Sequence, residues 1–182
     1  RENEAEEMAG ETLMRGAKNI VADDPALARE LAMEAIEMLE SNEDKLMYCI
    51  EPMRGAIGVF LKMQAPDDAI AIARRLIVVL QAIDAETLSN KMTMTYKFVF
   101  GIIIMHLHQK RFGDADKEFN DAMQYDGFPA SSDAQAAEAL LQALRGVDDE
   151  SFAKACKQQY IAVGLDKEIA NLGRKLKFWE VS

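Results

Sequence analysis

Paired carboxylates are abundant in this sequence, and three runs of them are candidates for acid–base chemistry, because two carboxyl groups with different pKa values can serve as general acid and general base. The runs are Asp23-Asp24, Asp67-Asp68 and Asp148-Asp149-Glu150. Each stands where an apolar helical pattern begins, and acidic side chains there satisfy free backbone N–H groups and the positive end of the helix dipole. We therefore interpret all three as helix starts.

The histidines and cysteines do not form a site either. His106 and His108 are two positions apart, which on a helix turns their side chains about 200° apart, so they do not share a metal ion. We expect one to point inward and the other to lie at the helix end. Cys49 and Cys156 stand alone in apolar contexts, which predicts core positions and a reducing compartment. Without a phosphate loop, CxxC pair or nucleophile elbow, the sequence predicts no enzyme, no metal and no cofactor.

Composition limits the class of partner. The chain has 182 residues, with 21 Lys and Arg against 31 Asp and Glu and a formal net charge of −10. Such an acidic surface repels nucleic acid and anionic lipid, so we expect no nucleic-acid partner.

The longest apolar run, residues 98–105, is well short of the roughly 20 residues that a membrane span needs. Residues 1–7 lack an initiating Met and a signal pattern, and we interpret this start as a cut within a longer chain.

The elements that position these residues are helices, because apolar residues recur with helical period almost throughout. The expected helices cover residues 2–21, 25–41, 44–64, 66–83, 85–109, 113–124, 132–145, 149–159 and 166–177. Short connections predict antiparallel helix hairpins. The fold class is therefore all-α.

A weak internal repeat refines this class. Segments beginning at Pro25, Pro66 and Phe112 share small and apolar residues at equivalent helical positions. The pattern resembles tetratricopeptide (TPR) repeats, with longer spacing than their usual 34 residues. We expect a TPR-like right-handed superhelix of hairpins over residues 1–126 and a C-terminal helical bundle over 127–182, packed on it as one domain.

A plug of turn and aromatic residues separates these two parts. Gly127 permits a positive φ, Pro129 stops the preceding helix, and Ser132 with Gln135 predicts a capping box that starts the next one. Phe128 is expected to be buried as a wedge.

Basic residues gather in the middle of the chain, among them Arg54, Lys91 and Lys97. Two interpretations stay open: an ordinary solvated helix face, or a basic strip that faces an acidic partner.

Several segments, in this order, resemble the C-terminal part of the soluble NSF attachment proteins, with the gamma type as the most similar. They are Tyr96-Lys97, the Gly127-Phe128-Pro129 plug, Ala139-Leu140-Leu141-Gln142-Ala143, Asp148-Asp149-Glu150 and the amphipathic helix of residues 165–172. The resemblance implies a non-enzymatic cytoplasmic adaptor, peripheral to membranes, that binds a SNARE complex and recruits the ATPase NSF for SNARE disassembly in vesicle trafficking and membrane fusion. Any lipid contact would then lie in a segment preceding this one.

The resemblance also suggests site residues. Lys97 matches a family lysine, and Lys91 and Arg54 join it by position as SNARE-binding residues. Asp148, Asp149 and Glu150 lie near the acidic cluster that meets NSF in the alpha type, although Arg145-Gly146 stands here where that type has adjacent glutamates. The alternative hypothesis is a TPR-like scaffold subunit of another assembly, of coat or proteasome-lid type, and NSF binding distinguishes the two.

Overall fold

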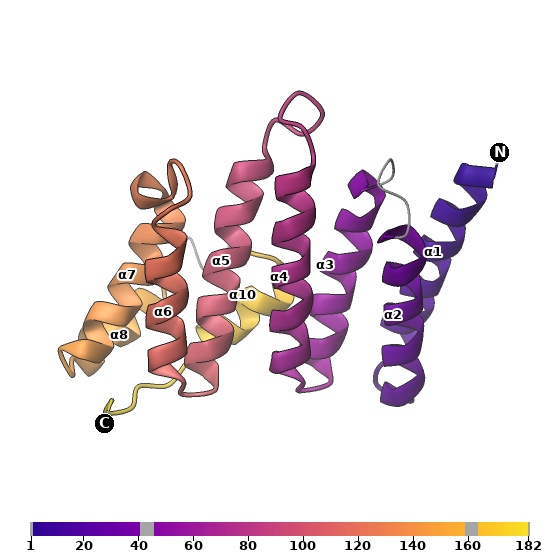
Figure 1. The fold of residues 1–182 in the computed structure, drawn as a ribbon. Coiled ribbons are helices and arrows are strands. Elements are labelled where there is room, and N and C mark those ends of the chain that lie inside the picture. The colour runs from indigo at the N-terminus through magenta and orange to yellow at the C-terminus, as the bar shows by residue number, and fades with distance from the viewer. Residues whose placement is uncertain (1, 41–45, 159–163, 182) are drawn as a thin grey trace. The chain divides into compact units, whose positions relative to one another are not determined.

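The structure is a computed structural model and is all-helical (Figure 1). It describes residues 2–40, 46–158 and 164–181, and within these ranges it contains nine α-helices, one 3₁₀ helix and no strands. The predicted all-α class of TPR-like helix hairpins is confirmed. The chain divides into two compact units, residues 1–92 and 93–182. The predicted boundary between residues 126 and 127 stays a prediction.

Unit 1 consists of two helix hairpins. α1 (Glu2–Ile20) pairs with α2 (Pro25–Glu40), and α3 (Leu46–Lys62) pairs with α4 (Pro66–Ala82). α2 also packs on α3, and α1 contacts α3. This is the neighbour-to-neighbour packing of a repeat protein.

Small residues allow these helices to approach closely. The small residues that the repeat shares include alanines near the start of α2 and α4 and one or two turns later. Five of them are fully buried: Ala28, Ala32, Ala35, Ala69 and Ala73. In the third copy Ala115 and Ala122 are buried, but Met123 is 40% exposed. The repeat therefore describes the core of the first two copies more accurately than that of the third.

Arginine side chains tie α2 to α4. The Arg29 guanidinium donates to both carboxylate oxygens of Asp68, at 2.7 and 2.6 Å, and lies 5.4 Å from the ring centroid of Phe60. Arg75 of α4 pairs with Glu40 at the end of α2. Asp68 stands in the first turn of α4, so this carboxylate serves both its helix start and the contact with the neighbouring hairpin.

Unit 2 holds most of α5 (Lys91–His108), followed by α6 (Phe112–Ala122), a 3₁₀ helix η2 (Phe128–Ala130), α7 (Ser132–Arg145), α8 (Asp149–Cys156) and α10 (Lys167–Arg174). α7 packs against α6, η2 and α8. α10 packs on α5 at Gly101, where the backbone has no side chain. Ile169 Cδ1 of α10 lies only 3.0 Å from the position that a Cβ at Gly101 would take. The buried side chains of α5, from Phe98 to Leu107, form much of the core of this unit.

The same turn closes three successive hairpins. Gln64, Lys110 and Val147 have φ of 58°, 59° and 52°. In each case the amide of the following residue donates to the carbonyl five positions back, from Ala65 to Phe60, from Arg111 to His106 and from Asp148 to Ala143. This is the Schellman pattern, usually built with glycine. Its third copy shows that α7 and α8 form a hairpin of the same kind as α3 with α4.

Two expected starts differ from the structure. α5 begins at Lys91 and not at residue 85, because the amides of Thr87 and Leu88 bond to the Asp84 carbonyl in a turn. α7 is capped by Ser131 and not by Ser132, since Ser131 is extended and its Oγ accepts from the Ala134 amide at 3.0 Å. The expected helix boundaries at residues 41, 44 and 159 lie outside the described residues, although α8 already ends at Cys156.

Candidate functional site

The acidic run at residues 148–150 forms the exposed start of α8. Asp148 is the N-cap, and its Oδ1 accepts from the Ser151 amide at 2.9 Å. Hydrogen bonds from the Ser151 side chain, and then from its backbone, hold the pKa of Asp148 below its ordinary value of 3.8. Asp149 and Glu150 occupy the first helical turn, and all three side chains are exposed. The predicted helix start is confirmed, and it presents three carboxylates to solvent.

The nearest preceding cation does not neutralise this cluster. Arg145, at the end of α7, pairs with Asp116 of α6 and lies 5.7 Å from the centroid of the Phe112 ring. Both of these contacts of the Arg145 guanidinium are with residues of α6. The start of α8 keeps its negative charge, which suits a basic partner surface.

The buried face of α8 fixes this acidic end to unit 2. Phe152, Ala155 and Cys156 are 1%, 3% and 5% exposed, and α8 packs against α7. Phe178 and Trp179, in the segment that follows α10, pack edge-on against Phe152. Sequence reasoning missed these two contact residues. The signal available was the pair of adjacent aromatic residues a few positions after an amphipathic helix.

The three basic residues predicted to bind a SNARE complex have separate surroundings. Arg54 of α3 pairs with Glu51 at 2.5 Å and keeps 34% of its side chain exposed. The Lys91 Nζ donates to the Ile83 carbonyl at 2.5 Å, just beyond α4. Lys97 is half-buried on α5. Arg54 and Lys91 belong to unit 1 and Lys97 to unit 2, and their assembly into one binding surface stays a prediction.

The histidines and cysteines have the expected structural positions. His106 is 4% exposed within α5, whereas His108, at its end, is exposed. Cys49 and Cys156 are buried and not joined in a disulfide, and burial raises the pKa of each thiol to about 11. At neutral pH these thiols are protonated, which removes the thiolate that nucleophilic chemistry requires.

These features define the class of protein as an all-α protein of TPR-like helix hairpins. Within the part of the chain that the structure describes, no helix has the length and apolar character to span a membrane. One exposed polar feature of unit 2 is the acidic start of α8.

Comparison with known proteins identifies a relative of this chain. The chain is 28% identical, over 175 residues, to a gamma-soluble NSF attachment protein of Arabidopsis thaliana. The similarity covers 96% of this chain and 57% of the length of that protein. No protein-family model matches. The chain is thus similar, at modest identity, to a soluble NSF attachment protein over nearly all of its own length.

Proposed function

We propose that this chain is part of an adaptor that recruits the ATPase NSF to SNARE complexes for their disassembly. The observation that carries the proposal is the similarity to a gamma-soluble NSF attachment protein over 96% of the chain. An all-helical hairpin architecture supports it, since stacked hairpins offer extended surfaces for protein partners. The proposed role is non-catalytic, cytoplasmic and peripheral to membranes.

The NSF contact is assigned to Asp148, Asp149 and Glu150. These side chains are exposed at the start of α8, whereas Phe152, Ala155 and Cys156 of the same helix are buried. Carboxylates grouped in this way attract a basic surface and speed its association, and salt weakens the attraction.

The SNARE contact is assigned to Lys97, Lys91 and Arg54. Lys97 and Lys91 lie on α5 and Arg54 on α3, the first helices of their hairpins. Arg54 keeps about a third of its side chain exposed while paired with Glu51. Since Glu51 is 74% exposed, an acidic partner can replace it at little cost.

The proposed function is tested by asking whether the immobilised chain retains purified NSF at low ionic strength. Retention that falls as salt is raised is the expected result. A chain that captures no NSF at low salt would overturn the proposal, and the TPR-like scaffold role would become the better hypothesis.

A further inference from the structure

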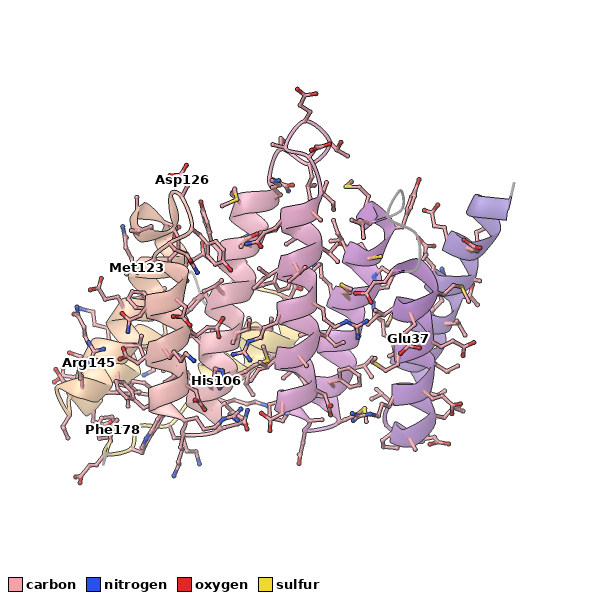
Figure 2. The ribbon with its side chains drawn as sticks, in the orientation of Figure 1. Glu37, His106, Met123, Asp126, Arg145 and Phe178 are labelled. Carbon is pink, nitrogen blue, oxygen red and sulfur yellow. The ribbon has the colours of Figure 1, made fainter. Side chains whose placement is uncertain are left out.

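Two aromatic side chains from the end of the described chain pack against α8. Phe178 and Trp179 belong to a segment without helix, residues 175–181, that follows α10. Their ring centroids lie 6.1 and 6.3 Å from that of Phe152, with interplanar angles of 65° and 80°. Edge-to-face pairs of this kind stabilise a contact beyond the area that they bury. We call these three residues the aromatic clip; Phe178 is labelled in Figure 2.

The other end of this segment is anchored in the core. Ile169 and Ala170 of α10 are 1% and 2% exposed, and Ile169 lies against Gly101 of α5. Leu176, two positions before Phe178, is 9% exposed. The clip therefore connects α8 to a helix that is itself seated on α5.

α8 is a short helix for which such a connection matters. It has eight residues, from Asp149 to Cys156, and an isolated helix of that length is not stable in water, so its stability comes from packing. Phe152 is its large buried side chain. Asp149 and Phe152 are three positions apart, about 60° around the helix axis, so a rotation that releases Phe152 also moves Asp149.

We propose that Phe178 and Trp179 are positioning residues, which act through Phe152 to fix the direction in which α8 presents its acidic residues to a basic partner. This inference rests on the proposed NSF contact for the identity of the partner. It assigns the clip residues an indirect role, since they hold α8 and need not touch NSF.

The structural half of the proposal is tested by hydrogen exchange on the unliganded chain. Replacing both Phe178→Ala and Trp179→Ala removes two aromatic pairs, and the amides of α8 should exchange about tenfold to a hundredfold faster while those of α5 keep their rates. Lys177→Ala with Glu180→Ala is the matched control, because these side chains are exposed in the same segment. Unchanged exchange of α8 in the clip variant would overturn the proposal.

Trp179 supplies a spectroscopic readout, because it is the one tryptophan of the chain. Packed against Phe152, its fluorescence should be shielded from acrylamide, and Phe152→Leu should increase quenching. The conservative Trp179→Phe variant keeps an aromatic ring at the clip and should restore slow exchange of α8. Quenching equal to that of free tryptophan in the unmodified chain would contradict the packing.

The functional half uses the affinity for the N-terminal domain of NSF. The clip variant should bind about tenfold more weakly, the Lys177/Glu180 control should bind like the unmodified chain, and Trp179→Phe should recover affinity. Faster exchange of α8 with unchanged affinity would overturn the positioning role. If the unmodified chain binds no NSF, the proposed function fails, whereas the exchange experiment still decides whether the clip holds α8.

Discussion

Tyr96 and Phe128, 32 positions apart in the sequence, meet edge-on with ring centroids 5.6 Å apart. The Tyr96 hydroxyl also donates to the backbone carbonyl of Asp126. Gly127 follows with φ of 78°, and a Cβ there would lie 2.8 Å from the Tyr96 hydroxyl oxygen. The connection between α6 and α7 is thus held against α5 by an aromatic pair, and its glycine is required both for backbone conformation and for space.

Removing the Phe128 ring tests this packing. Phe128 is fully buried and also meets Phe119, with ring centroids 6.1 Å apart. Phe128→Ala should lower the free energy of unfolding by about 3–5 kcal/mol, and Phe128→Leu, which keeps more volume, should cost less. Urea denaturation followed by circular dichroism measures both. A loss well under about 1 kcal/mol for the alanine variant would show that the ring is not a core wedge.

The hairpin turn between α7 and α8 predicts a stabilising substitution. Val147 is β-branched, 55% exposed, and has φ of 52°, a backbone conformation that costs non-glycine residues roughly 1–2 kcal/mol. Val147→Gly should raise the unfolding free energy by up to about 1 kcal/mol, after allowance for the greater flexibility of glycine in the unfolded chain. Val147→Ala keeps the left-handed strain and serves as the control. Gly127→Ala should lower the unfolding free energy, and equal stability of all these variants would contradict the strain at Val147 and the steric requirement at Gly127.

The N-cap of α8 predicts a dependence on pH. The pKa of Asp148 is lower in the folded chain than its ordinary 3.8, chiefly because of the hydrogen bond with the Ser151 side chain. The cap therefore contributes stability that is present above pH 3.8 and is lost as pH falls through the lower folded pKa. Carboxyl NMR titration should give a midpoint below 3.8, and Ser151→Ala should move it upward. A midpoint at or above 3.8 in the unmodified chain would contradict the cap.

The cysteines predict slow thiol chemistry in the folded chain. Burial raises the pKa of Cys49 and of Cys156 from 9.0 to about 11. Ellman's reagent at pH 8 should react slowly with the native chain and rapidly with both thiols in denaturant. Because the folded pKa values are the higher ones, the stability from these neutral thiols is present below pH 9 and is lost as pH rises toward 11. Rapid reaction of the native protein would show that the thiols are accessible.

Local patterns predicted much of the fold. Proline and acidic residues marked the starts of α2 and α4, and at the start of α2 the Asp24 Oδ1 accepts from the Leu27 amide at 3.0 Å. Helical periodicity identified the buried alanines. The predicted start of α5 was wrong. Residues 84–90, which are polar at their end, form hydrogen-bonded turns, and helical periodicity cannot distinguish such turns from a first helical turn. Ser131 and Ser132 are equivalent by composition, and only backbone conformation decided which of them caps α7.

The candidate site was predictable to a smaller extent. Asp148, Asp149 and Glu150 are consecutive, so one helix start places them together. The clip contact between Phe152 and Trp179, like the Arg145 pair with Asp116, joins residues far apart in sequence. Tertiary packing brings these groups together, and no local spacing rule encodes it.

The most direct test of the proposal that NSF binds the acidic start of α8 compares two variants that each remove negative charge. Each variant is titrated calorimetrically with the N-terminal domain of NSF at low salt. One replaces Asp148, Asp149 and Glu150 by serine or alanine. The other replaces the exposed α2 glutamates Glu30, Glu34 and Glu37. This replacement removes the same amount of negative charge, but from unit 1. The proposal predicts that the α8 variant loses most of the affinity and of its salt dependence, whereas the α2 variant binds like the unmodified chain. Equal binding by the unmodified chain and the α8 variant would contradict the assignment of the NSF contact to α8.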